Sequence, residues 1–145
     1  MKMRVKIILL AALLCFSTYS SAANEKEKKA VKAVLVTAYV NGLHINRDEK
    51  AVRAGFHSDF VMQIFSDGRI IKATLDMWLE RLALDGKKNP KRVEHKFNFV
   101  DVTGNSAMVK MEIHEDSKQI YTDYFLLYKF DDGWKIVSKT FYSYS

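Results

Sequence analysis

The apolar residues in the first half of the chain recur at helical spacing. A first stripe, with members three and four residues apart, ends near Gly42 and consists of Val31, Val34, Leu35, Ala38 and Tyr39. This spacing predicts an amphipathic helix from Ala30 onward, after a charged lead-in over residues 24–29. Asn46, with Glu49 three residues later, has the spacing of a capping box and predicts a second helix that stops near Gly55.

A short hairpin and a third helix follow. Residues 60–65 are rich in strand-forming side chains, and Asp67-Gly68 is typical of the turn to a return strand over residues 69–72. Thr74 predicts the N-cap of the third helix, and Gly86 predicts its end. The apolar residues of this helix again lie at helical spacing, at Leu75, Trp78, Leu79 and Leu82.

After Pro90 the apolar residues alternate with polar ones, which predicts strands. Two strands joined at Gly104-Asn105 each have one apolar face. These faces consist of Val93, His95, Phe97 and Phe99 in the first strand, and of Ala107, Val109, Met111 and Ile113 in the second. Helices grouped before strands indicate an α+β fold. We expect three helices in a strongly curved, mostly antiparallel sheet of four to six strands, with the Val109 face against the helices.

The last two strands, over residues 118–130 and 134–143, are joined by Asp132-Gly133. The first of them is apolar on both faces: Ile120, Tyr124, Leu126, Tyr128 and Phe130 alternate with Tyr121, Phe125 and Leu127, and Asp123 lies among the latter. Helices can cover only one face, and a large exposed apolar patch is uncommon in a monomer. We therefore predict a homodimer through an outer sheet face formed by Tyr121, Phe125, Leu127 and Phe141. The alternative is that the charged lead-in covers that face.

The N-terminus has the three parts of a secretory signal peptide. Lys2, Arg4 and Lys6 precede an uncharged run over residues 7–23, which ends in small residues. The apolar part is short for a membrane span, so cleavage after Ala23, or after Ala22, is expected rather than an uncleaved anchor. We predict a signal peptide over residues 1–23, a single domain over residues 24–145, a periplasmic or secreted location, and no membrane attachment after cleavage.

Charge and cysteine content narrow the possible functions. The formal charge of the full chain is +6, and cleavage would remove three of its cations. The remaining excess is too small to indicate nucleic-acid binding. The single cysteine, Cys15, lies inside the predicted signal, so the mature domain would have neither a disulfide nor a thiolate metal site. His44, His95 and His114 lack metal-ligand spacing, and no glycine-rich phosphate loop is present, so we expect no metal and no cofactor.

Several strings of the sequence occur together, in order, in one known family. They are Ala30-Val-Lys-Ala-Val-Leu, Phe56-His-Ser-Asp, Thr74-Leu-Asp-Met-Trp-Leu, Phe99-Val-Asp-Val-Thr-Gly104, Thr122-Asp-Tyr and Trp134-Lys-Ile-Val-Ser-Lys-Thr-Phe141. With them, the chain resembles the putative lumazine-binding family of the nuclear transport factor two-like superfamily. This resemblance implies a cystatin-like cone with a central cavity. The superfamily includes isomerases, cyclases, dehydratases and binding or assembly modules, so the fold does not define the function.

The residues expected to line this cavity are Tyr39, His57, Phe60, Met62, Trp78, Phe97, Tyr124 and Thr140. Two of the titratable residues are candidates for catalysis. His57 is either a general base or part of a turn, and Asp123 is either a proton shuttle in the cavity or a paired charge at an interface. Where the superfamily's ketosteroid isomerases carry their aspartate base, this chain has Met62, Gln63 or Ile64, which argues against isomerase chemistry.

Three functions are compatible with these features. The preferred one is an exported module that holds a small, flat, apolar ligand in the cone. The second is a cofactor-independent lyase or isomerase that uses Asp123 or His57 in the same cavity. The third is a structural or accessory dimer without a ligand. Converging proton-transfer groups would distinguish the second from the first, and a cavity filled by its own side chains would indicate the third.

Overall fold

The computed structural model describes residues 23–144. Residues 23–34 form an α-helix that continues directly into the π-helical segment η1. The other elements follow in the predicted order: η1 (Leu35–Ile45), α2 (Glu49–Gly55), β1 (Phe56–Ser66), β2 (Arg69–Thr74), α3 (Leu75–Leu82), β3 (Val93–Thr103), β4 (Ser106–Glu115), β5 (Lys118–Phe130) and β6 (Gly133–Ser143). The predicted signal peptide lies, except for Ala23, outside the described residues.

The first helix begins earlier than predicted, because the charged lead-in is itself helical. Lys28 pairs with Glu25 one turn away, and Glu27 accepts hydrogen bonds from Lys129 and from the indole nitrogen of Trp134. These contacts hold the first turns against the sheet. The lead-in therefore does not cover the outer face of the sheet.

The second half of the first helix is wound as a π-helix, and its end is closed by a bond from the Asn46 N–H to the Asn41 carbonyl at 2.7 Å. The cap of α2 is Asp48, whose carboxylate accepts from the Ala51 N–H, and not Asn46 as predicted. Thr74 caps α3 as predicted, but the helix ends at Ala83 in a left-handed conformation, before Gly86.

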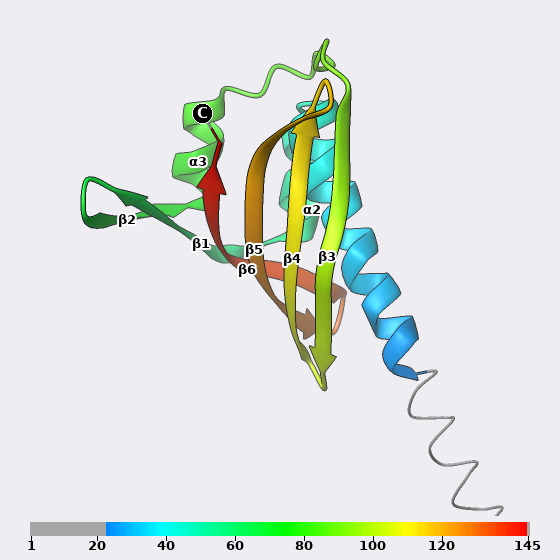
Figure 1. Cartoon of the computed structure of the whole chain (residues 1–145). Coiled ribbons are helices and arrows are strands. Elements are labelled where there is room, and N and C mark those ends of the chain that lie inside the picture. Colours follow the sequence, from blue (N-terminus) through cyan, green and yellow to red (C-terminus); the bar gives the residue numbers. More distant parts are fainter. Residues whose placement is uncertain (1–22, 145) are drawn as a thin grey trace, which may run out of the picture.

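All six strands form one sheet in the order β2-β1-β6-β5-β4-β3. The β1–β6 pair is parallel and every other pair is antiparallel, so the sheet is mixed. Figure 1 shows the sheet curving around the helices, with the β1–β2 hairpin extending to one side. The loop from α3 to β3 crosses the end of the sheet at which β6 and the chain terminate (Figure 1). The α+β architecture predicted from the sequence is confirmed.

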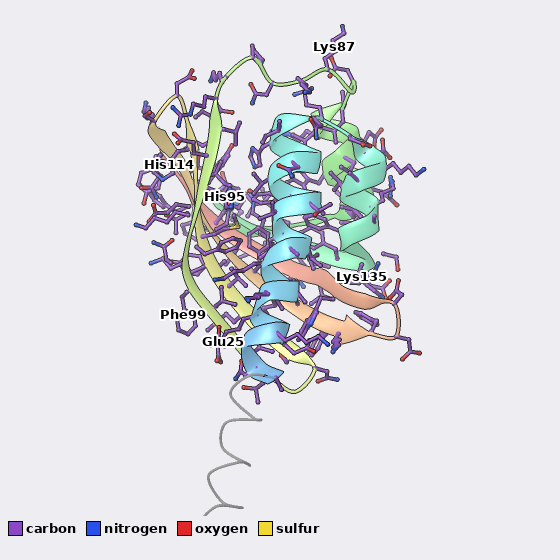
Figure 2. All side chains as sticks on the ribbon, turned by 90° about the vertical axis from the view of Figure 1, so that its right-hand side faces the viewer. Glu25, Lys87, His95, Phe99, His114 and Lys135 are labelled. Carbon is purple, nitrogen blue, oxygen red and sulfur yellow. The ribbon has the colours of Figure 1, made fainter. Side chains whose placement is uncertain are left out.

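The concave face of the sheet holds the core. Ala107, Val109, Met111 and Ile113 of β4 are all buried there, as predicted. In β3, the pairing with β4 shifts by one residue at Asn98. This bulge turns Phe97 toward the core and Phe99 away from it, so the prediction that both share a face is wrong. Figure 2 shows Phe99 pointing away from the helices.

The prediction for the faces of β5 is also wrong. Phe125 and Leu127 are buried against the helices, whereas Tyr124, Leu126 and Tyr128 are exposed on the convex face. The reason is the pairing with β4, in which Phe125 lies opposite Val109. Directly opposed residues in adjacent strands share a face, so the inward Val109 fixes Phe125 inward. Tyr121 and Phe141 also pack against the core and do not form an outer patch.

Strand β6 carries a bulge that decides which side chains enter the concave side. Leu126 pairs with Ser138 and Leu127 with Ile136, so Val137 is an extra residue. Upstream of the bulge, Trp134 and Ile136 point inward. Downstream, Lys139 is buried and Thr140 is exposed, whereas unbroken alternation would give the reverse.

Candidate functional site

A cavity of about 370 Å³ lies between η1, α3 and the sheet, at the end where β6 terminates. Its walls come from both helices, from strands β1, β4, β5 and β6, and from the loops after η1 and α3. They are formed by Tyr39, Leu43, His44, Arg47, Met62, Trp78, Leu82, Leu84, Asn89, Glu115, Ile120, Tyr121, Lys139, Phe141, Ser143 and Tyr144. The walls combine aromatic rings with polar and charged groups, so the cavity suits a flat ligand with a polar edge.

The deep end of the cavity holds a buried triangle of three polar side chains. Lys139 Nζ lies 2.9 Å from Asp123 Oδ1 and donates a hydrogen bond to the Tyr39 hydroxyl at 2.9 Å. That hydroxyl in turn donates to Asp123 Oδ2 at 2.8 Å. The exposed fractions are 4% for Lys139, 0% for Asp123 and 1% for Tyr39. Lys139 and Tyr39 border the cavity, and Asp123 lies behind them.

Aromatic rings surround the ammonium group of Lys139. Its Nζ lies between 4.6 and 5.8 Å from five ring centroids, which belong to Phe141, Tyr39, Trp78, Tyr121 and Phe125. Ring faces attract a cation, so they partly replace the lost hydration of the ammonium. An apolar pocket of this kind also makes the neutral amine accessible, because burial always disfavours the charged form.

Burial and the ion pair act in opposite directions on Lys139. Burial lowers the pKa of its ammonium below the usual value, and the Asp123 carboxylate opposes that shift. Burial, reinforced by Asp123, raises the pKa of the Tyr39 phenol well above its ordinary value. Tyr39 is therefore a hydrogen-bond donor at neutral pH, and Lys139 is the group in the triangle that burial makes easier to deprotonate.

His44 lies one π-helical turn from Tyr39 and also borders the cavity. Burial, and to a smaller extent the Lys139 cation, lower its pKa to about 3, so the ring is neutral at physiological pH. Its Nε2 atom is buried and has no hydrogen-bond partner among the described residues. The ring also contacts Tyr39 edge to face, at 4.7 Å between centroids. An unpaired buried ring nitrogen at a cavity wall is an available contact for a polar ligand atom.

The open end of the cavity is held by the loop between α3 and β3. Asn89 binds the His44 carbonyl and Glu115 through its side-chain amide, each at 3.1 Å, and its backbone N–H binds Ile45. Arg47 forms an ion pair with Asp85 at 2.8 Å. These contacts tie the loop to the end of η1, so the rim of the cavity is charged, whereas its deep end combines aromatic rings with the buried triangle.

The structure brings only some of the predicted cavity residues together. Tyr39, Met62 and Trp78 line the cavity. Phe60 is fully buried beside Trp78, with ring centroids 5.9 Å apart, and does not reach the cavity. Three others lie elsewhere. Phe97 of β3 packs against the core, and Tyr124 and Thr140 point to the convex side.

The two predicted catalytic candidates have different positions. Asp123 belongs to the buried triangle. His57 lies outside the cavity, stacked on Phe130 at 4.6 Å, and its Nδ1 accepts a hydrogen bond from the Asp59 N–H. This local contact with the backbone is what the turn interpretation of His57 implies.

Neither Lys139 nor the position of His44 at the cavity was predicted from the sequence. Lys139 follows Ser138 in a strand that appears half-exposed, and only the bulge at Val137 turns it inward. The available signal was Asp123, because an aspartate among inward aromatic residues needs a buried cation as its partner.

Among residues 23–144, no cluster of three or more potential metal ligands is found. Within the same range, no helix is both long and apolar enough to cross a membrane.

The chain is similar to one characterised protein in sequence and to several solved structures in fold. The chain is 29% identical to Aldolase FrzH from Cladobotryum sp over 115 residues, which cover 77% of this chain and 90% of that protein. It resembles the crystal structure of an NTF2-like protein of unknown function from Shewanella baltica OS155, with a TM-score of 0.70 and 20% identity over 83% of this chain and 95% of the other. It also resembles the association domain of C. elegans CaMKII, with a TM-score of 0.61 and 14% identity over 83% and 98% of the two chains.

The two structural likenesses establish the NTF2-like fold and nothing about function, because one fold carries many functions. The family model described as putative lumazine-binding matches residues 26–142, which is most of the chain. The chain therefore belongs to the putative lumazine-binding family.

Proposed function

We propose that this protein is an exported module that binds a small, flat molecule in the cavity between η1, α3 and the sheet. The observation that carries this proposal is the polar deep end of the cavity, where Lys139, Tyr39 and the unpaired His44 Nε2 meet. A cavity serving only as packing space would be expected to be apolar, since buried polar groups without partners are costly. The name of the family also favours a ligand-binding module.

The size and the walls of the cavity define the ligand class. A volume of about 370 Å³ lies within the range of small-molecule sites, roughly 300–1,000 Å³. Trp78, Tyr121 and Phe141 provide aromatic walls for a flat ring. At the deep end, Lys139 and Tyr39 favour a ligand with an acceptor such as a carbonyl oxygen, and the charged rim accommodates a second polar edge.

Native mass spectrometry of freshly purified protein tests this function, followed by titration with lumazine as the first probe while tryptophan fluorescence is recorded. A retained small molecule, or saturable quenching, is expected for the native protein. Leu82→Trp should abolish either signal, because Leu82 lines the cavity. Met77→Trp is the matched control, since Met77 is exposed on the same helix. A native protein with neither signal, or a Leu82→Trp variant that still binds, would contradict the proposal.

A second candidate function is catalysis in the same cavity. Similarity to Aldolase FrzH over most of both chains favours it, together with a triangle of amine, carboxylate and phenol at the deep end. Such an enzyme would be a cofactor-independent lyase. Binding without turnover of carbonyl compounds would leave the binding module as the function.

Export is proposed on the N-terminal sequence. Lys2, Arg4 and Lys6 followed by an uncharged run and small residues support a cleaved signal peptide and a periplasmic or secreted location. N-terminal sequencing by mass spectrometry of protein from the envelope fraction should give a chain starting at Ala23 or Asn24. Intact Met1 in the cytoplasmic fraction would contradict export.

We also propose a homodimer through the convex face, with different residues from those the sequence predicted. The exposed apolar side chains there include Tyr124, Leu126 and Tyr128 of β5 and Met108 of β4. They lie side by side because Leu126 pairs with Met108 across the two strands. A twofold contact would let this patch cover its own copy.

A further inference from the structure

Among the residues that the structure describes, Lys139 is the only lysine that lines the cavity. Tyr39 and Asp123 each bind its Nζ at 2.9 Å, and five aromatic rings lie around it with centroids 4.6 to 5.8 Å away. We propose that Lys139 is a nucleophile that forms a covalent imine with a small aldehyde or ketone bound in this cavity. Because the reaction takes place inside the cavity, it requires that the cavity admit a small molecule, as proposed above.

Attack requires a neutral amine, and the structure places a proton acceptor beside it. Asp123 Oδ1 lies 2.9 Å from Nζ, so the ammonium proton can pass to the carboxylate without travelling through solvent. The transfer converts a buried ion pair into two neutral groups. Burial disfavours both charges, so the cost of this transfer is much smaller here than for a pair in water. A lysine desolvated in an apolar pocket is an established kind of activated nucleophile.

The remaining groups complete the reaction. The Nζ lone pair forms a bond to the carbonyl carbon, and the carbonyl oxygen takes up a proton to become a hydroxyl. The Tyr39 hydroxyl, 2.9 Å from Nζ and 2.8 Å from Asp123, is placed to relay a proton from the carboxyl group to this oxygen. The carbinolamine nitrogen then gives a second proton to Asp123, and Tyr39 relays it to the hydroxyl group. The carbon–oxygen bond breaks with release of water, and the nitrogen lone pair forms the double bond of a protonated imine (iminium), with no oxidant or reductant. The five surrounding rings stabilise the iminium cation as they do the ammonium.

The walls restrict the carbonyl compound to a flat, conjugated one. Phe141, Trp78 and Tyr39 are the rings nearest to Nζ, at 4.6, 5.1 and 4.7 Å, so a conjugated aldehyde would lie among ring faces when its carbonyl carbon reaches the amine. The neutral His44 ring borders the same space and offers its Nε2 to a polar substituent. The ligand class is therefore a small aromatic or conjugated aldehyde or ketone.

Reductive trapping tests this reaction on the whole mature chain. The protein is incubated with trans-cinnamaldehyde and sodium cyanoborohydride, and the adduct is located by intact mass and peptide mapping. We expect a single early adduct at Lys139, ahead of every exposed lysine. Cinnamyl alcohol, which has the same shape but no carbonyl, should slow this labelling by competition and should quench tryptophan fluorescence without forming an adduct.

Two variants control for the accessibility and the folding of the protein. Lys139→Met combined with Asp123→Leu removes both charges, keeps the core filled and should lose the early adduct while still binding cinnamyl alcohol. Lys110→Arg removes a half-buried lysine of the convex side and should leave the adduct unchanged. Circular dichroism establishes that each variant is folded.

The outcomes separate this reaction from the proposed function. Binding of cinnamyl alcohol without early labelling at Lys139 would overturn the imine and would leave the binding module intact, with Lys139 in a structural ion pair. Labelling confined to exposed lysines would overturn it equally. Neither binding nor labelling, together with no retained small molecule and no lumazine quenching, would count against both.

Discussion

The concave and convex faces of the sheet are built from alternate residues of the same strands, yet they present different chemistry. On β5, Asp123 and Phe125 point into the core, and Tyr124 and Leu126 point out of it. Most side chains of the concave side pack in the core, but one buried ion pair lies beside the cavity. On the convex side, Tyr124, Leu126 and Tyr128 form an exposed apolar row along β5, and the Lys96–Glu112 ion pair near it is partly exposed. Ligand binding is therefore expected on the concave side, and contact between two chains on the convex side.

Two lysines of β6 make the same contrast within one strand. Lys135 lies near the surface, pairs with Asp132 at 3.0 Å and binds the Ala54 carbonyl. Lys139, four residues later, is buried in the triangle. An exposed ion pair contributes little to stability because water competes for both charges, whereas a buried one becomes costly when either partner is removed. The two lysines therefore differ in what their loss would do.

The largest effect is expected from a charge placed on the concave face. Val109→Asp puts a carboxylate at a position with 0% exposure and should destabilise the domain by several kcal/mol, enough to unfold it. Met108→Asp, at the adjacent exposed position, should remain folded. Urea unfolding followed by circular dichroism measures both. Equal stability of the two variants would remove the distinction between the faces.

A somewhat smaller effect is expected from breaking the buried pair. Lys139→Met leaves the Asp123 carboxylate without its cation and should lower the free energy of unfolding by roughly 3–5 kcal/mol. Adding Asp123→Leu should restore much of that loss, because the second change removes the stranded charge. The side chain of Lys135 is 20% exposed and pairs at the surface with Asp132, so Lys135→Met is the surface control and should change stability by less than about 1 kcal/mol. If Lys139→Met and Lys135→Met cost the same, the triangle is not closed to water.

A pH titration should sharpen the comparison at His44. Its pKa is about 3 in the folded protein and near 6.5 when unfolded, so between these values only the unfolded chain binds the proton. Stability should therefore fall as the pH drops below about 6.5, by about 1–2 kcal/mol at pH 5. His44→Gln should flatten this part of the pH profile. His95→Gln, on an exposed residue, should leave it unchanged.

The smallest effect on stability is expected on the convex face, together with the clearest effect on association. Leu126→Glu should leave the melting temperature almost unchanged, because Leu126 is 50% exposed in the single chain. Sedimentation at micromolar concentration should then give the mass of one chain, where the native protein gives twice that mass. Lys50→Glu, at an exposed position of α2 away from the convex face, is a control for charge alone. A native chain that is monomeric at every concentration would contradict the dimer.

The order of the elements could be predicted from the sequence because the apolar spacing changes clearly at Pro90, from helical to alternating. The face of β4 could be predicted for the same reason, since Lys110 and Glu112 alternate with its apolar residues. On β5 both sets are apolar, so alternation alone gives two faces without saying which is inside. Regular pairing counted from the turn before Lys118 would not have resolved this, because it would place Tyr124 opposite Val109. The register shifts by one residue between Ile113 and His114, and this shift brings Phe125 opposite Val109.

Much of the candidate site depends on features that alternation cannot reveal. The bulges at Asn98 and Val137 each insert one residue, which reverses the faces beyond them. Phe97 and Phe99 were separated by the first, and Lys139 and Thr140 exchanged sides at the second. Tyr39 and Trp78 were recognised because each lies on a helix with a clear stripe. His44 lies at the π-helical end of the first helix, beyond the last residue of the predicted stripe.

The extra residue at Val137 makes the reactive groups of the cavity depend on the pairing register of β6. Pairing without the bulge, at unchanged chain length, would turn Ser138 and Thr140 toward the helices and Lys139 toward the convex side. The cavity would then present hydroxyl groups in place of an ammonium, and Asp123 would lose its counter-ion. Deletion of Val137 would instead keep the present partners of Ser138 and Lys139 and leave the lysine inward. A slip of one residue in strand pairing, with no change of sequence, thus separates an amine-bearing from a hydroxyl-bearing pocket.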